Sequence, residues 1–400
     1  PSSQIIGIMA GGDAALVRSI ESFEDHPEWG ARMLADLGFA PGDLLIATTE
    51  GGETPYVIGA TEYAADHSAT PPFFLYCNPD DILARVARRS AAVLADPRIQ
   101  KINLTVGPMA ITGSTRMQAS TVLMAAVGWA IAHRGSPAGI QNSAAAFSSL
   151  LGSTDLAHLT PFTTFEAGAY RAGDYLLYDP GTMGITVITD TTERSPTFSL
   201  TPFENHNRPE DPPSLSYLHL PGTPDSTTAW NILLNRPPNN IGWPALAHLT
   251  GKNTTLGFDF SDQLPRQRAI RTNNAQHHQF KIRTTPDAIR FTLGDLHHAF
   301  PTPGASPFHQ HLLLKLLLNT HSTLVMGRLG RYRGNLMTYV SPTNHKLVDR
   351  AARYVSQLLA QKAITPIPYE TIVRQIFHDR ADLPNDEPIV LKTLNHFLPT

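Results

Sequence analysis

Four short segments of this 400-residue chain combine residue types that bind anions or move protons. Two are rich in threonine, serine and glycine beside an expected helix start, and two carry carboxylates. They are residues 20–25, 47–55, 112–116 and 188–196. Hydroxyls, free amides and arginines suit a phosphate, whereas carboxylates in separate environments suit general acid–base catalysis.

The segment at 47–55 lies between an expected strand and an expected helix. Its candidate phosphate-binding residues are Thr48, Thr49, Gly51 and Thr54. Free backbone amides and the helix dipole favour an anion at a helix N-terminus, and Pro55 fits the first helical position. The alternative is an ordinary turn between strand and helix. Glu50 and Glu53 also oppose a phosphate unless their side chains point away.

A second candidate anion site precedes a long apolar helix. It contains Ser114, Thr115 and Arg116. Arginine can pair with a phosphate or a carboxylate through two parallel hydrogen bonds. The alternative is a helix cap, in which the hydroxyls serve only the backbone.

The two carboxylate segments are less specific when each is taken alone. Glu24 lies near the end of an expected helix, where solvation of the helix end is an alternative explanation. Glu193 precedes Arg194, so the two residues could form a surface ion pair.

Composition limits the classes of function. The net charge is −3 and no long basic run occurs, so we expect no nucleic-acid partner. A single cysteine, Cys77, fits a reducing compartment, and the apolar runs are too short to cross a membrane, so we expect a cytoplasmic protein. The 17 histidines include the adjacent pairs His277-His278 and His297-His298 but form no metal-binding motif, so we expect neither a metal nor another cofactor.

The elements that would position these segments alternate between strand and helix in the first 135 residues. This alternation predicts an α/β fold with parallel strands. We expect strands at 5–9, 43–47, 73–77 and 101–105, and helices at 13–23, 27–37, 55–65, 81–94 and 116–133. Small polar residues at 135–153 interrupt the pattern.

A second unit repeats this order. We expect a helix at 161–172, a strand at 175–178, a helix from 183, strands at 255–260, 279–282 and 288–293, a helix at 309–328, and helices from 345 onward. A Pro-, Thr- and Asn-rich stretch starting at 201 reads as an irregular surface excursion. Long apolar helices late in both units suggest a duplication.

Taken together, the motifs resemble the N-acetylmuramic acid 6-phosphate etherases, whose domains have the sugar-isomerase (SIS) fold. The matching stretches of the first half are Ala10-Gly11-Gly12, Glu21-x-x-Glu24-Asp25, Thr54-Pro55-Tyr56-Val57-Ile58, Cys77-Asn78-Pro79 and Thr112-Gly113-Ser114-Thr115-Arg116-Met117. Those of the second half are Asp190-x-x-Glu193-x-x-Pro196-Thr197-Phe198, Lys315-Leu316-x-Leu318-Asn319, Asn335-Leu336-Met337 and Asn344-x-Lys346-Leu347. The tandem arrangement and the long loop at 48–54 resemble the related glucokinase regulatory proteins.

The resemblance implies two tandem flavodoxin-like, parallel-sheet SIS domains. The first would occupy 1–145, the second 146–345 with an irregular insertion at about 201–275, and a helical segment 346–400. In the family a strand and a glycine loop precede the position of Ile5, so we expect that the sequence is truncated or that the first domain lacks them. Met183 and Ile185 replace a serine and an arginine of the family's second glycine loop, which favours one composite site over two.

The resemblance also implies a lyase reaction on N-acetylmuramic acid 6-phosphate, which yields N-acetylglucosamine 6-phosphate and D-lactate. Glu24 would be the base and Glu193 the proton donor. The hydroxyl and glycine segments with Arg116 would hold phosphate, and Lys315 would contact sugar or phosphate. The alternatives are a non-catalytic sugar-phosphate sensor that regulates a sugar kinase, and an aldose–ketose isomerase. Assembly into a homo-oligomer is left open.

Overall fold

The first unit is a small three-layer α/β structure. The computed structural model describes residues 5–20, 23–340, 342, 345–384 and 387–398. Strands β1 (Ile46–Thr48), β2 (Phe73–Tyr76) and β3 (Gln100–Asn103) form a parallel sheet in the order β1-β2-β3. Its helices are α1 (Pro27–Asp36), α2 (Pro55–His67), α3 (Asp80–Val86), α4 (Arg88–Ala95) and α5 (Ala119–Ala132).

Two glycines let α1 and α2 approach each other closely. A Cβ atom at Gly30 would lie 1.9 Å from the carbonyl oxygen of Tyr56, and one at Gly59 would lie 2.0 Å from that of Pro27. Backbone atoms cannot yield as a flexible side chain can, so both contacts require glycine. This packing fixes the start of α2, and with it the loop at 48–54.

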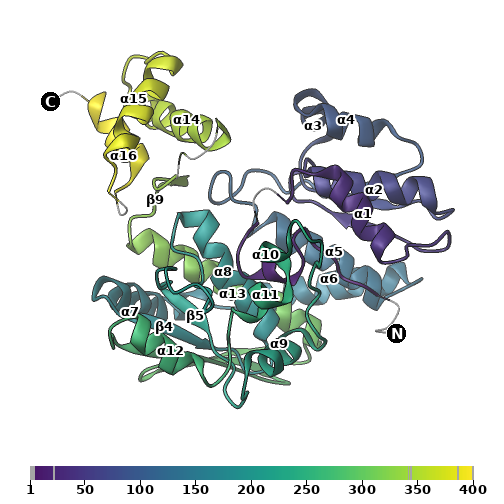
Figure 1. Cartoon of the computed structure of the whole chain (residues 1–400), viewed down its shortest axis with the longest axis horizontal. Coiled ribbons are helices and arrows are strands. Elements are labelled where there is room, and N and C mark those ends of the chain that lie inside the picture. The colour runs from purple at the N-terminus through teal and green to yellow at the C-terminus, as the bar shows by residue number, and fades with distance from the viewer. Residues whose placement is uncertain (1–4, 21–22, 341, 343–344, 385–386, 399–400) are drawn as a thin grey trace.

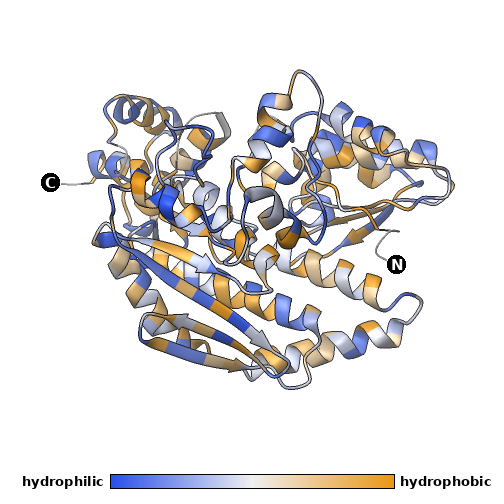
Figure 2. Ribbon diagram, turned by 60° about the horizontal axis from the view of Figure 1, so that its bottom comes forward, coloured by the Kyte–Doolittle hydropathy of each residue, from blue (hydrophilic) through white to orange (hydrophobic). Residues whose placement is uncertain are grey.

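The second unit holds the larger sheet, in the order β5-β4-β6-β7-β8. Its strands are β4 (Tyr175–Asp179), β5 (Ser216–Leu218), β6 (His277–Thr285), β7 (Ala288–Leu293) and β8 (Leu296–Pro301). Strand β4 pairs in parallel with β5 and β6, whereas β6, β7 and β8 form an antiparallel meander. Hydrophilic and hydrophobic residues alternate along the long strands, as expected where one face of a sheet is buried (Figure 2).

Helices of the second unit cover this sheet and connect it to the first unit. They include α7 (Thr160–Arg171), α8 (Gly184–Phe198) and α13 (Pro307–Arg328). Helix α13 packs against α5, so the two long apolar helices noted in the sequence meet at the junction of the units (Figure 1). The Nζ of Lys315 donates to the carbonyl oxygen of Arg116 (2.8 Å) and to Oγ1 of Thr121 (2.7 Å) across this contact.

The C-terminal helices form a third body with a core of its own. Helices α14 (His345–Gln361), α15 (Tyr369–Ala381) and α16 (Ile389–His396) lie far from α1–α4 in Figure 1. A short hairpin of β9 (Tyr332–Arg333) and β10 (Leu336–Met337) joins them to α13. The hydroxyl of Tyr354 donates to the carbonyl oxygen of Thr112 at 2.6 Å, which ties α14 to the segment at 112–116.

These observations confirm the α/β class, the parallel strands and the helical C-terminal segment. Most expected elements also occur, with ends shifted by a few residues. The second sheet is mixed rather than purely parallel, because β7 and β8 return by tight connections instead of crossover helices. Within the described part of the chain, no helix is both long and apolar enough to cross a membrane. The domain boundaries stay predictions.

The N-terminal expectations were partly wrong. Residues 5–9 form no strand: no described strand pairs with them, and Ile5 and Ile6 are 44% and 62% exposed. The helix expected at 13–23 is reduced to the short 3₁₀ helix η2 (Asp13–Leu16), and residues 21 and 22 lie outside the described residues. This segment packs on the second unit, where Val17 joins the main core.

Two expected irregular stretches are in fact ordered. Residues 135–153 contain α6 (Pro137–Gly152), which the hydroxyl of Ser136 caps by accepting from the amide of Gly139 at 3.2 Å. The stretch 201–275 supplies β5 and four helices: α9 (Ser226–Leu234), α10 (Ala247–Thr250), α11 (Lys252–Leu256) and α12 (Leu264–Arg271). Helix α11 occupies part of the strand expected at 255–260.

The stretch 201–275 also binds the N-terminal segment. The amide of Asp13 donates to the carbonyl oxygen of Asn239 (3.1 Å), and Arg236 forms an ion pair with Asp13 (2.6 Å). The segment at 236–250, called the strap below, is therefore bound to the N-terminal segment and is not a free loop.

The close approach of α1 and α2 yields a stability prediction. Gly30→Ala should lower the free energy of unfolding by about 1–3 kcal/mol, because its methyl group overlaps the backbone of Tyr56. Gly168→Ala in α7 is the matched control, since a Cβ atom there meets nothing within 4 Å. The control should be neutral or stabilising by up to about 1 kcal/mol. Urea unfolding of both variants tests this, and equal effects would contradict the packing argument.

Candidate functional site

Helix α8 presents charged residues in two directions. Asp190 and Arg194 are four residues apart and lie buried on its inner face. Glu193 lines a cavity of about 160 Å³ and is exposed to solvent there. Protein surrounds its other sides. The lining residues are Ala15, Leu16, Val17, Arg18, Ser19, Thr192, Glu193, Ser195, Pro196 and Pro202. The N-terminal segment and the second unit therefore build this cavity together.

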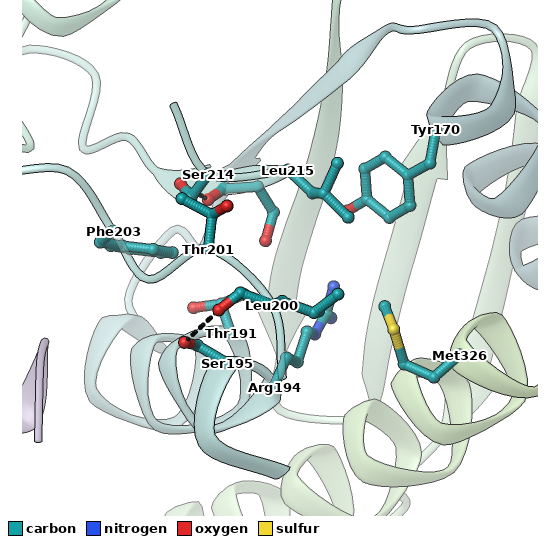
Figure 3. A pocket seen from close by; sticks show the side chains of 11 residues that line it. Tyr170, Thr191, Arg194, Ser195, Leu200, Thr201, Phe203, Ser214, Leu215 and Met326 are labelled. Atoms are coloured by element: carbon teal, nitrogen blue, oxygen red, sulfur yellow. Dashed lines mark hydrogen bonds between the residues drawn. The ribbon is translucent and has the colours of Figure 1, made fainter. Parts of the chain in front are cut away.

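The inner side of α8 is closed to ligands. The cavity drawn in Figure 3 has a volume of about 10 Å³, which is enough for one water molecule at most. Arg194, Tyr170 and Met326 converge on it in that view. Of these two cavities, the one that Glu193 lines is the larger.

A network of buried charges fixes this inner face. Arg194 forms ion pairs with Glu166 (2.7 Å) and Asp190 (2.8 Å), and His321 Nε2 lies 2.7 Å from Oε2 of Glu166. Burial by itself would raise the pKa of Glu166, but the charges of Arg194 and His321 hold it at about 2. The network thus keeps its carboxylates ionised and α8 in one orientation.

Two carboxylates of the first unit act on Glu193 of the second. Burial raises the pKa of Glu193, the cation of Arg116 lowers it, and the negative charges of Glu50 and Glu24 raise it further. Glu24 and Glu50 come from the first unit, whereas Glu193 comes from the second. The two predicted catalytic glutamates are therefore within electrostatic reach of each other, although they are 169 positions apart in the sequence.

Aromatic packing positions Glu24. The preceding Phe23 is fully buried between Trp29, Tyr56 and Trp243, with ring centroids 4.6–5.8 Å apart. The backbone oxygen of Glu24 accepts from the amide of Tyr56 at 3.0 Å. The strap at 236–250 therefore supports this carboxylate through Trp243.

The loop at 48–54 is held rigidly. Oγ1 of Thr49 and Oγ1 of Thr54 are 3.0 Å apart, and the backbone oxygen of Gly51 accepts from Asn78 at 3.0 Å. Gly52 has a positive φ of 78°, and a Cβ atom there would lie 2.6 Å from Leu83. Glycine is thus required at this turn. Thr48 ends β1 immediately before the loop.

Glu50 does not point away from the site, which qualifies the expected phosphate cradle. Its carboxylate accepts a hydrogen bond from the hydroxyl of Thr115, and its charge acts on Glu193 and Lys315. The loop therefore brings a negative charge to the place where the sequence predicted an anion. Phosphate binding by this loop stays a prediction.

Arg116 lies inside the protein rather than on an open surface. Its Nη1 is 3.6 Å from Oδ1 of Asp190, and its Nη2 donates to the hydroxyl of Ser322 at 2.6 Å. Its Nε is buried and has no hydrogen-bond partner among the described residues. Arg116 therefore joins the two units. Ser114 is also buried, and its amide donates to Ile111 (3.0 Å).

Lys315 is also engaged by internal partners. Besides its two contacts with the first unit, its Nζ donates to Oδ1 of Asn319 at 2.9 Å. Burial and the charge of Arg116 lower its pKa to about 8. Lys315 thus lies beside the predicted site, and its contact with a sugar stays a prediction.

The structure therefore brings Glu24, Glu193, the loop at 48–54, the segment at 112–116 and Lys315 to one region. The sequence interpretation did not single out Glu166, quoted Asp190 only within a motif, and considered Glu50 only as a charge that opposes phosphate. The four-residue spacing of Asp190 and Arg194 was the available signal for Asp190. No group of three or more metal-ligating side chains occurs among the residues that the structure describes.

Comparison with known proteins agrees with the motifs. Residues 1–65 match the family model "Glucokinase regulatory protein N-terminal SIS domain". N-acetylmuramic acid 6-phosphate etherases are 40% identical over 121 residues in Mesorhizobium japonicum and 40% over 119 residues in Aliivibrio fischeri. The first match covers 30% of this chain and 36% of the relative, and the second covers 29% and 35%.

The matched region spans about a third of the length of these curated relatives. Within that region the identity is high enough to support a common fold, and the matched domain model is of the SIS type. The resemblance inferred from the motifs is confirmed: this chain is similar in sequence to SIS-domain proteins of the N-acetylmuramic acid 6-phosphate etherase and glucokinase regulatory protein type.

Proposed function

We propose that this protein is a carbon–oxygen lyase that removes the lactyl ether of N-acetylmuramic acid 6-phosphate. The observation that carries the proposal is the position of Glu193 in a cavity that the N-terminal segment helps to build, where the charge of Glu24 from the first half raises its pKa. Proteins with this activity in their names are about 40% identical to part of the chain, which supports the choice of substrate.

The reaction requires two proton transfers on one sugar. A base removes the proton from C2, next to the aldehyde, while an acid protonates the ether oxygen on C3. The C3–O bond breaks, lactate leaves, and a C2–C3 double bond forms. Addition of water, with hydroxide at C3 and a proton at C2, then gives N-acetylglucosamine 6-phosphate. Two carboxylates in different environments can divide these roles.

The environment of Glu193 suits the acid. Burial and the neighbouring negative charges raise its pKa and so favour the protonated form, which is the form that can donate. Glu24 is then the base. Its side chain is exposed, and its backbone is held by the packing of Phe23.

One phosphate site per chain follows from the asymmetry of the halves. The N-terminus of α8 would be the second anion site. However, the buried Met183 occupies its N-cap position, and Ile185 lies two residues further on. The first half retains the family-like segment at 112–116. The proposed ligand set is Thr48, Thr49, Gly51, Thr54, Ser114, Thr115, Arg116 and Lys315.

The wider assignment follows from the same proposal. The two SIS domains would span 1–145 and 146–345, followed by the helical segment at 346–400. Such an enzyme would act in the cytoplasm on amino sugars from cell-wall recycling.

A second candidate function is a non-catalytic sensor of a sugar phosphate. The match of residues 1–65 to the glucokinase regulatory protein domain and the long loop with Glu50 favour it. A sensor would bind the sugar phosphate and a sugar kinase but release no lactate. Assay of lactate release by the purified protein separates the two functions.

The roles of the glutamates can be tested separately. Glu24→Gln and Glu193→Gln should each lower lactate release by about 10²–10⁴-fold, as for loss of a general acid or base. Glu193→Gln should still exchange the C2 hydrogen for deuterium from solvent, because the base remains. Glu24→Gln should lose that exchange. Glu370→Gln, in the exposed first turn of α15, is the control and should behave as wild type. Exchange in Glu24→Gln at the wild-type rate would overturn the assignment.

Glu50 should tune the pH dependence. Its negative charge raises the pKa of Glu193, so Glu50→Gln should lower that pKa. Because the acid must be protonated, activity is lost as the pH rises through its pKa. The alkaline limb of the kcat/KM profile should therefore move to lower pH. Glu53→Gln in the same loop is the control, and a limb that stays in place in Glu50→Gln would contradict this coupling.

Stoichiometry tests the composite site. Titration calorimetry of Glu24→Gln with N-acetylmuramic acid 6-phosphate should give one site per chain, since Met183 closes the second loop. Two equivalent sites would refute the asymmetry argument.

A further inference from the structure

A larger cavity adjoins that of Glu193. Its volume is about 350 Å³, and the two cavities share Arg18 and Ser19 as lining residues. The remaining lining residues are Ala14, Ile20, Arg208, Leu249, Thr254 and Phe258. Of the two, the larger cavity falls within the size range of small-molecule sites, about 300–1,000 Å³. None of the residues assigned to phosphate or to proton transfer lines it.

Arg18 stands between the two cavities in a fixed position. Its Nη2 donates to the carbonyl oxygen of Phe203 (2.8 Å) and to Oδ2 of Asp211 (2.9 Å). Its Nε is buried and has no hydrogen-bond partner in the described part of the chain. Asp211 thus holds the guanidinium in place without using all of its donors.

The second arginine of the cavity has few partners. Within the described residues, the side chain of Arg208 makes one long hydrogen bond, to the carbonyl oxygen of His248 at 3.4 Å. The nearby Arg271 donates to the backbone oxygens of Arg208 and Pro209 (3.3 and 3.4 Å). Asp211 forms an ion pair with Arg18. The two arginines that line the cavity therefore carry more positive charge than this one carboxylate balances.

The rest of the lining is mostly apolar. Ala14, Ile20, Leu249 and Phe258 line the cavity together with the hydroxyl-bearing Ser19 and Thr254. A ligand that combines a short carbon chain with a carboxylate matches such a surface, because arginine binds carboxylates through two parallel donors and the chain contacts the apolar wall.

We propose that this cavity is a subsite for the carboxylate of the departing acid group. The inference rests on the proposed function, in which Glu193 protonates the ether oxygen. The lactyl group extends from that oxygen, and the cavity that continues from Glu193 past Arg18 is the space on that side. Arg18 and Arg208 then select ethers that carry an acid over ethers that do not.

Binding of two matched sugars tests the subsite. The ligands are N-acetylmuramic acid 6-phosphate and 3-O-ethyl-N-acetylglucosamine 6-phosphate, which has the same phosphate and ether but no carboxylate. The protein is the full chain with Glu24→Gln, which prevents turnover and leaves both cavities intact. The acid should bind at least about tenfold more tightly than the ethyl ether, as expected for a charge-assisted hydrogen bond.

Substitution of Arg208 should remove this preference. In the same background, Arg208→Gln should weaken binding of N-acetylmuramic acid 6-phosphate to the affinity of the ethyl ether and leave the affinity of the ethyl ether unchanged. Arg208→Lys should restore part of the difference in affinity. Arg266→Gln, an exposed arginine of α12 outside the cavity, is the control. Arg18→Lys tests the second arginine and keeps a cation beside Asp211, so folding is preserved.

The outcomes separate the subsite from the proposed function. Equal affinity for both sugars would overturn the subsite, and so would an equal loss for both in Arg208→Gln, which would assign the arginine to the phosphate. A preference for the acid that depends on Arg208, in a protein that releases no lactate, would support the subsite and reject the lyase. Lactate release by a protein that shows no preference for the acid would support the lyase and reject the subsite.

Discussion

The buried ion pairs that join Arg116, Asp190, Arg194 and Glu166 determine how the two units of the chain meet. Arg116 comes from the first unit and the other three from the second, and all four are almost fully buried. Removing one partner of such a pair leaves an uncompensated charge and costs about 3–5 kcal/mol. The network therefore allows one arrangement of α8 against the first unit. In that arrangement Glu193 lines the cavity, and the charge of Glu24 acts on it.

Local sequence patterns were sufficient for the elements that carry the site, but not for their contacts. The apolar runs of β2 and β4 and the Pro-led start of α2 are local signals, and the structure has all three. The segment at 5–9 has the same apolar character as a strand. It forms none because pairing requires a neighbouring strand, and no described strand lies beside it. The sequence of a segment does not by itself determine a property that depends on a partner distant in the chain.

The same limit explains what was missed in the site. Glu24 and Glu193 could be singled out because their motifs resemble a known family. Glu166 and His321 carry no such motif, and each sits in a stretch whose pattern predicts only a buried helix. The charge of Glu166 is tolerated in the core because Arg194 and two tyrosine hydroxyls satisfy its carboxylate. Such compensation is a property of the packed fold, so single-sequence reasoning does not reveal it.

The stretch 201–275 changes how the two halves relate to the chemistry. If it were an irregular excursion, it would contribute nothing to the surroundings of Glu24 and Glu193. Instead it supports Glu24 through Trp243, holds Asp13 through Arg236, and supplies Arg208 and Phe258 to the larger cavity. The second half thus surrounds the N-terminal segment of the first. Residues 202, 208, 249, 254 and 258 line the two cavities together with the N-terminal segment, so the space beside Glu193 is built by residues that are far apart in the sequence.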